Sequence, residues 1–202
     1  MTGTIVRFDS ESVFRAKSVV LHGGLIVYPT DTVYGLGCDP TNEDAVRRLL
    51  EAKRRDKRPI PILCSSIGAA MKLVEMNQRA LELAGRFWPG ALTIVAPLKL
   101  TLPFLLHQGT GTLGVRVPAM PLCVTLIEAC GDWLTGTSAN LSGSPSARTA
   151  EEASSQLGDQ VDLILDGGRL EGFESTVVQA VGESIQVLRV GPVRVMDETR
   201  ER

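Results

Sequence analysis

Short apolar runs alternate with amphipathic segments along most of this chain. Seven runs rich in Val, Ile and Leu have the length of β-strands, at residues 25–28, 60–64, 92–96, 113–117, 161–165, 176–181 and 185–190. Four segments instead place apolar residues three or four positions apart, as one face of a helix does, at residues 43–53, 78–87, 121–130 and 150–157. This alternation predicts an α/β fold.

The spacing of these elements also indicates how the strands pair. Strands in the middle of the chain are followed by helices, which is typical of parallel pairing, whereas only the turn-like residues 182–184 separate the last two runs. We therefore expect a twisted mixed sheet flanked by helices. Thr41 or Asn42 is placed to cap the first of the four helices, and Thr149 the last.

Composition sets limits on the class of protein. The chain has 202 residues, 44% of them hydrophobic, which is enough for one sizeable core, so we expect a single domain over residues 1–202. The formal net charge of −2 argues against a surface that binds nucleic acid by bulk electrostatics. The first residues do not have the pattern of a secretory leader, and no apolar stretch approaches the ~20 residues of a membrane helix, so we expect a cytoplasmic protein without membrane contact.

The cysteines and histidines do not form a metal-binding pattern. Cys38, Cys64, Cys123 and Cys130 have no Cys-x-x-Cys spacing, and no His-Glu-x-x-His motif occurs. We therefore expect reduced thiols in the core rather than metal ligands or disulfides, and no metal site.

Two short motifs lack the context that their usual chemistry needs. Residues 109–114 match G-x-G-x-x-G, but the match precedes a predicted strand instead of following one, which disfavours a Rossmann dinucleotide site. Residues 136–140 are similar to a nucleophile elbow, yet His22 and His107 both lie upstream, and a hydrolase of that type needs a downstream histidine. No P-loop sequence occurs, so other groups would have to hold any nucleotide.

Three polar segments remain at the edges of apolar runs. Residues 28–37 include Thr30 and Thr32, which fit either contact with a small polar substrate or a structural turn. Residues 53–58 hold five cations, which fit either a solvated helix end or a clamp for an anion. Residues 137–146 are rich in hydroxyl and amide groups, which fit either a turn or the neutral donors of a triphosphate site.

The order of these segments resembles that of the YrdC-type threonylcarbamoyl-AMP synthases, in their single-domain form, over about residues 23–192. The matching motifs lie at residues 29–37, 52–55, 88–93, 115–118, 138–143, 166–168, 174–176 and 188–192. Each motif is weak alone, and their common order carries the resemblance. It implies a YrdC-like fold.

The resemblance also assigns roles to individual residues. It implies a catalytic group made of Lys53, Arg55, Ser138 and Asn140. It implies that L-threonine contacts Thr30, Arg116 and Ser175. It implies that ATP contacts Lys53, Thr112, Ser138, Asn140, Ser146 and Arg189.

Two departures from the family's pattern affect this assignment. Asp56 stands where the family usually has Pro, and the spacer to the next Pro is one residue shorter, so Arg54 competes with Arg55 for the clamp role. Many members also have a His at the end of the following strand, where this chain has Leu63-Cys64. No general base is therefore assigned.

The reaction that the resemblance implies is a nucleotidyl transfer. L-Threonine and bicarbonate form N-carboxy-threonine, whose carboxylate attacks the α-phosphorus of ATP, releases pyrophosphate and gives threonylcarbamoyl-AMP for N6-threonylcarbamoyladenosine formation in tRNA. Mg²⁺ accompanies ATP as a substrate, and no tightly held cofactor is expected. A downstream transferase that acts on tRNA is the implied partner, with at most a weak RNA contact. Such a displacement needs positioning and charge rather than a protein nucleophile.

Two other functions are weighed against this one. A non-catalytic module for double-stranded RNA is disfavoured by the net charge of −2 and by the lack of aromatic residues in the basic run. A carbamoyl-transfer role, like that of the related domain in hydrogenase-maturation proteins, is disfavoured because that domain lies within a much longer chain.

Overall fold

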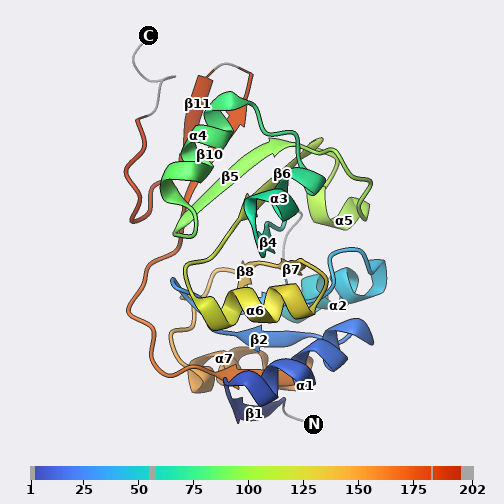
Figure 1. Ribbon diagram of the computed structural model, residues 1–202. Helices are drawn as coiled ribbons and strands as arrows, with labels where there is room; N and C mark the ends of the chain where they lie inside the picture. Colours follow the sequence, from blue (N-terminus) through green and yellow to red (C-terminus); the bar gives the residue numbers. More distant parts are fainter. Residues whose placement is uncertain (1–2, 55–57, 183, 197–202) are drawn as a thin grey trace.

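The strands of this protein form two mixed sheets rather than one (Figure 1). The computed structural model describes residues 3–54, 58–182 and 184–196. Sheet A has the strand order β1 (Thr4–Arg7), β9 (Leu163–Asp166), β2 (Ile26–Tyr28), β3 (Gly35–Gly37) and β8 (Thr137–Ser138). Sheet B has the order β11 (Ser184–Arg189), β10 (Thr176–Val181), β5 (Leu92–Pro97), β6 (Thr112–Arg116), β4 (Ile62–Cys64) and β7 (Trp133–Thr135).

Both sheets combine parallel and antiparallel pairs. In sheet A, β9 pairs in parallel with β1 and β2, and β3 pairs antiparallel with β2 and β8. In sheet B, β10 is parallel to β5 and β4 to β6, whereas the other neighbours are antiparallel. The predicted α/β class with mixed pairing is confirmed. The antiparallel pair β10–β11 agrees with the predicted turn, of which Glu183 lies outside the described residues.

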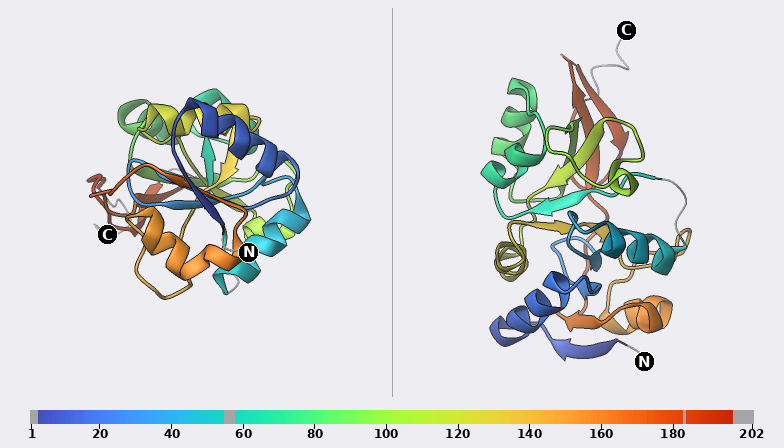
Figure 2. Two further views of the ribbon diagram at one scale, coloured as in Figure 1. Left: turned by 90° about the horizontal axis from the view of Figure 1, so that it is seen from below. Right: turned by 90° about the vertical axis from the view of Figure 1, so that its right-hand side faces the viewer.

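Helices cover the outer faces of the two sheets. They are α1 (Ser10–Leu21), α2 (Glu43–Lys53), α3 (Ile67–Leu73), α4 (Gln78–Phe87), α5 (Phe104–His107), α6 (Pro121–Ala129) and α7 (Ala150–Leu157), with a 3₁₀ turn at Gly158–Gln160. Helices α1 and α7 pack on sheet A, α3, α4 and α5 pack on sheet B, and α6 contacts α1, β4 and β7 (Figures 1 and 2). Among the helices of the described residues, none is long and apolar enough to cross a membrane.

Side-chain caps fix where two predicted helices begin. The Asn42 side chain accepts a hydrogen bond from the Ala45 amide at 3.1 Å, so Asn42 rather than Thr41 caps α2. Thr149 likewise accepts from the Glu152 amide at 3.1 Å and caps α7. Each cap satisfies an amide that has no partner within its helix.

The two sheets share their hydrophobic cores. One cluster of buried side chains contains Val27 of sheet A and Ile94 of sheet B, and a second contains Ile26 of sheet A and Leu63 of sheet B. Each sheet therefore buries apolar surface that the other helps to cover. This arrangement supports our proposal that residues 1–202 form a single domain, with the matching motifs at 23–192 as its core.

The chain crosses from sheet B to sheet A at one residue, Gly136, which lies between β7 and β8. A Cβ atom at this position would lie 2.7 Å from Cγ of Leu63, so a side chain does not fit without a shift. The Gly136 amide also donates to the Pro61 carbonyl at 2.8 Å. The crossing brings the polar ends of strands from both sheets to one place.

The predicted core thiols are confirmed. Cys38, Cys64, Cys123 and Cys130 are all buried, and none of them forms a disulfide. Burial raises the pKa of Cys38 and of Cys130 to about 12, and it raises the pKa of the other two thiols as well. These thiols therefore stay protonated near neutral pH and are poor nucleophiles there.

Candidate active site

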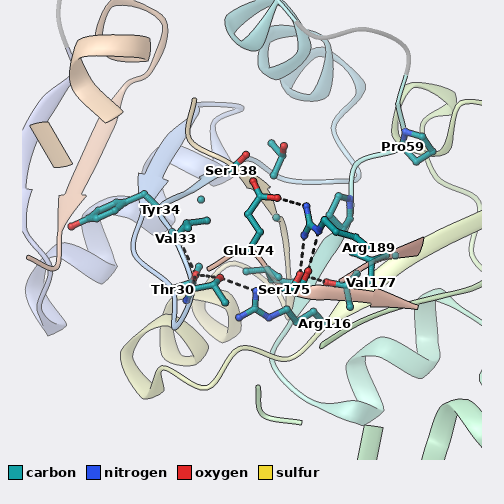
Figure 3. Close-up of a pocket in the computed structure, with 18 of the residues that line it drawn as sticks. Thr30, Val33, Tyr34, Pro59, Arg116, Ser138, Glu174, Ser175, Val177 and Arg189 are labelled. Atoms are coloured by element: carbon teal, nitrogen blue, oxygen red, sulfur yellow. Dashed lines mark hydrogen bonds and ion pairs between the residues drawn. The ribbon is translucent and has the colours of Figure 1, made fainter. Parts of the chain in front are cut away.

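A cavity of about 260 Å³, lined by both polar and apolar residues, lies at the junction of the two sheets (Figure 3). Sheet A contributes the loop between β2 and β3 and the strand β8, and sheet B contributes residues of β4, β5, β6, β10 and β11. Five of the predicted site residues line this cavity: Thr30, Arg116, Ser138, Ser175 and Arg189. Residues that are far apart in the sequence thus meet in one place.

The loop after β2 uses its threonine hydroxyls to hold its own shape. The Thr30 hydroxyl donates to the Val33 carbonyl at 2.7 Å, and the hydroxyl oxygens of Thr30 and Thr32 are 2.9 Å apart. Both side chains are buried, yet both line the cavity. The loop is therefore a structural turn that also presents hydroxyl groups to a ligand, so the two interpretations of this segment are compatible.

Arg116 is a buried cation at the wall of the cavity. It is only 5% exposed, and its Nη2 forms an ion pair with Asp31 Oδ1 at 2.5 Å. Nη1 donates to the Thr32 hydroxyl at 3.0 Å, and Nε donates to the Gly90 carbonyl at 2.8 Å. These contacts fix the plane of the guanidinium group before any ligand binds.

A second arginine, Arg189, lines the cavity beside Ser175. Its Nε donates to the Ser175 carbonyl at 3.0 Å and its Nη2 to the Ser175 hydroxyl at 3.2 Å. The Ser175 hydroxyl also lies 2.8 Å from that of Thr93. Unlike Arg116, the Arg189 side chain is 45% exposed, and it forms an ion pair with Glu174.

Glu174 is a cavity residue to which the sequence analysis gave no role. Its Oε1 accepts a hydrogen bond from the Ser146 hydroxyl at 2.6 Å, and its Oε2 pairs with Nη1 of Arg189. The residue belongs to the matching motif at 174–176, but a carboxylate has no obvious place among anion-binding groups. Only the three-dimensional contacts reveal its partners.

Lys53 is not a solvated helix end, and that interpretation was wrong. Its side chain is 2% exposed, and Nζ donates to the Asn140 carbonyl at 2.8 Å, to Asn140 Oδ1 at 3.2 Å and to the Ser138 carbonyl. A buried ammonium needs such acceptors to offset its lost hydration. The loop after β8 provides them, so Lys53 holds Ser138 and Asn140 in place.

The predicted catalytic group is therefore assembled in part. Lys53, Ser138 and Asn140 lie together, and the Ser138 hydroxyl donates to Asn140 Oδ1 at 2.5 Å. Of these three, only Ser138 lines the cavity. Arg55 lies outside the described residues. Arg54 is exposed and ends α2 in the left-handed conformation, with φ of 47°.

Thr112 and Ser146, both predicted to contact ATP, do not line the cavity itself. Thr112 begins β6, and strand alternation places it on the same face as the cavity residues Gly114 and Arg116. Its hydroxyl donates to that of Thr110 at 3.3 Å. Ser146 connects to the cavity through its hydrogen bond to Glu174.

Two tyrosines brace the loops around the cavity. Tyr28 donates to the Thr135 carbonyl at 2.8 Å. Its ring lies so close to two glycines that a Cβ atom on Gly35 or Gly37 would be only 2.9 or 2.7 Å from a ring atom. Tyr34 donates to the Gly168 carbonyl at 2.7 Å. Burial raises the pKa of Tyr34 to about 12, so this phenol is neutral at physiological pH and acts as a hydrogen-bond donor.

Taken as a class, this is an α/β protein with a cation-containing polar cavity between two sheets, suited to a small anionic ligand. The family model Sua5_yciO_yrdC, described as "Telomere recombination", matches residues 18–191. The threonylcarbamoyl-AMP synthase of Halorhodospira halophila is 38% identical over 179 residues, which is 88% of this chain and 93% of that protein. The chain thus belongs to the Sua5/YciO/YrdC family.

Solved structures agree with this assignment. Pyrococcus abyssi Sua5, in its complex with L-threonine, has a TM-score of 0.87 and 35% sequence identity, covering 94% of this chain and 57% of that one. Escherichia coli YciO has a TM-score of 0.88 and 28% identity, covering 96% of this chain and 98% of that one. The predicted YrdC-like fold is confirmed. The present chain spans little more than half the length of the P. abyssi protein.

Proposed function

We propose that this protein is an L-threonylcarbamoyladenylate synthase, a nucleotidyltransferase that joins L-threonine, bicarbonate and ATP. The observation that carries the proposal is the pair of arginines in one cavity: Arg116 is buried and rigid, whereas Arg189 is partly exposed. Two cations in one cavity suit two anionic groups, the carboxylate of an amino acid and the phosphates of a nucleotide. The names of relatives such as the H. halophila enzyme support the same reaction.

L-Threonine is the ligand that we assign to the Arg116 side of the cavity. The three described contacts of Arg116 use three of the five guanidinium N–H donors, so donors remain for a substrate carboxylate. The hydroxyls of Thr30 and Ser175 line the same cavity and suit the amino and hydroxyl groups of threonine. The complex of P. abyssi Sua5 with L-threonine supports this choice.

ATP, as its magnesium complex, is the ligand that we assign to the Arg189 side. Ser138 and Arg189 line the same cavity, and the Ser146 hydroxyl donates to Glu174, the carboxylate that pairs with Arg189. We infer that Lys53 and Asn140 support the phosphates chiefly by holding the loop that carries Ser138. Thr112 is the further residue that we assign to the nucleotide.

The reaction then needs no protein nucleophile. The threonine amine bonds to the carbon of bicarbonate, water leaves, and N-carboxy-threonine forms. Its carboxylate oxygen then bonds to the α-phosphorus of ATP while the bond from that phosphorus to the bridging oxygen breaks and pyrophosphate leaves. The arginine and hydroxyl donors would orient the reactants and stabilise charge that builds up on the phosphate oxygens. The product, threonylcarbamoyl-AMP, would serve a transferase that modifies tRNA.

The test is an assay of products with each substrate omitted in turn. Purified protein with ATP, Mg²⁺, L-threonine and bicarbonate should release pyrophosphate and form threonylcarbamoyl-AMP, identified by mass spectrometry, in the absence of RNA. Omission of threonine or bicarbonate should abolish the product, since each provides atoms of the attacking group. Pyrophosphate release that does not need threonine would contradict the proposal, as would an inactive protein that binds duplex RNA with steep salt dependence.

A further inference from the structure

Glu174 contacts two of the side chains that we assign to the nucleotide, Ser146 and Arg189. Its two carboxylate oxygens divide between them: Oε1 accepts from the Ser146 hydroxyl at 2.6 Å, and Oε2 pairs with Arg189. Figure 3 shows Glu174 reaching into the middle of the cavity toward the Arg189 guanidinium. A carboxylate thus takes the place that an anionic ligand would take.

The exposure of this ion pair indicates that it can exchange partners. The side chains of Arg189 and Glu174 are 45% and 38% exposed, so water can solvate either group when they separate. The Asp31–Arg116 pair differs, because its side chains are only 15% and 6% exposed and separation would leave a buried charge. Of the two arginine pairs in the cavity, only the one at Arg189 separates at low cost.

The backbone beside Glu174 is tightly packed, which limits the exchange to the side chain. A Cβ atom on Gly191 would lie 2.5 Å from the Glu174 carbonyl oxygen, and one on Gly172 would lie 2.4 Å from that of Thr32. The backbone at Gly172 therefore packs closely against Thr32, and the backbone at Glu174 packs closely against Gly191. Rotation of the Glu174 side chain toward solvent is the movement that the packing leaves available.

We propose that Glu174 is an internal anion that holds Arg189 and Ser146 in the unliganded protein and is displaced by the phosphates of ATP. The identity of the ligand rests on the proposed function. A carboxylate and a polyphosphate cannot share these donors, because the two anions repel each other and compete for the same N–H and O–H groups. Glu174 thereby lowers nucleotide affinity and orders the two donors before ATP arrives.

The experiment measures ATP binding without turnover. Isothermal titration of the wild type, Glu174→Gln and Glu171→Gln with ATP is carried out in the presence of Mg²⁺, without threonine or bicarbonate, so that no turnover occurs. Glu174→Gln should lower the Kd for ATP by about three- to tenfold, since removal of the charge ends the competition. Glu171→Gln is the matched control, because Glu171 lies on the same segment and pairs with exposed Arg169, and it should leave Kd unchanged.

Two further measurements make the result decisive. Inorganic tripolyphosphate should show the same gain in affinity, because the competition concerns phosphates and not adenosine. Glu174→Asp, which keeps the charge on a shorter side chain, should give a smaller gain. An unchanged or weaker affinity of a folded Glu174→Gln protein, or no ATP binding by any variant, would overturn the proposal. Because no catalysis is measured, failure of the synthase reaction with this pattern of binding intact would refute only the proposed function.

Discussion

At the scale of single residues, burial separates cations that look alike in the sequence. Arg116 and Arg189 both lie near the ends of apolar runs, yet one has a largely buried carboxylate partner and the other a partly exposed one. Lys53 begins a basic run that is typical of a solvent-exposed helix end, yet its ammonium group lies inside the protein. The sequence predicts which residues are charged, but partners that are 14 to 87 positions away decide their roles.

Replacement of Lys53 by Met should lower both stability and turnover. The variant keeps most of the apolar stem but leaves the carbonyls of Ser138 and Asn140 without their donor, so we expect a loss of about 2–4 kcal/mol in the free energy of unfolding. Chemical denaturation and steady-state assays measure the two effects. Lys72→Met is the control, because Lys72 is exposed. Normal stability of Lys53→Met would contradict the role given to its ammonium group.

Replacement of Asp31 by Asn should act on threonine through Arg116. The uncharged amide keeps the shape of the side chain but removes the ion pair that positions the Arg116 guanidinium group. We therefore expect the KM for threonine to rise about tenfold or more while the KM for ATP changes little. Asp44→Asn, at an exposed aspartate paired with Arg47, is the control. A larger change in the KM for ATP than for threonine would remove Asp31 from this role.

At the scale of elements, hydrophobic spacing predicted helices α2, α4, α6 and α7, but it missed α1, the longest helix among the described residues, and the short strand β3. Helix α1 has a capping box at Asp9 and Ser12. Its apolar residues do not all lie on one face, because Phe14 and Leu21 are exposed, and its helical spacing is therefore less clear in the sequence. Strand β3 has the sequence Gly-Leu-Gly, which propensity places in a loop. It pairs as a strand because the ring of Tyr28 lies across its glycines. Tertiary contacts thus override the local preference.

The end of α2 offers a test of which arginine acts in the clamp. Arg54 is exposed and has a φ of 47°, where glycine is preferred, so Arg54→Gly should leave stability unchanged or raise it by up to about 1 kcal/mol. We expect turnover to stay within about twofold, which would leave the clamp role to Arg55. Thermal denaturation and steady-state assays of Arg54→Gly and Arg55→Ala measure this. A tenfold or greater loss of turnover in Arg54→Gly alone would assign the clamp to Arg54.

At the scale of the whole molecule, the site exists because two sheets meet. The sequence predicted most of the strands, the polar loops and, by resemblance, five of the residues that line the cavity. It did not divide the strands into two sheets, because the crossing at Gly136 needs only one residue between β7 and β8 and leaves no linker. The sequence also did not predict that Glu174 contacts Ser146 and Arg189, because these partners are 28 and 15 positions away from it along the chain.

The central claim is that one cavity holds both substrates, with Arg116 on the threonine side and Arg189 on the ATP side. Steady-state kinetics of Arg116→Lys and Arg189→Lys test it most directly, because each variant keeps the charge but loses the planar fork that binds carboxylate or phosphate through two bonds. We predict that Arg116→Lys raises the KM for threonine about tenfold and that Arg189→Lys raises the KM for ATP by a similar factor, each with little effect on the other substrate. Equal shifts in both constants for both variants, or the opposite pairing, would contradict this account.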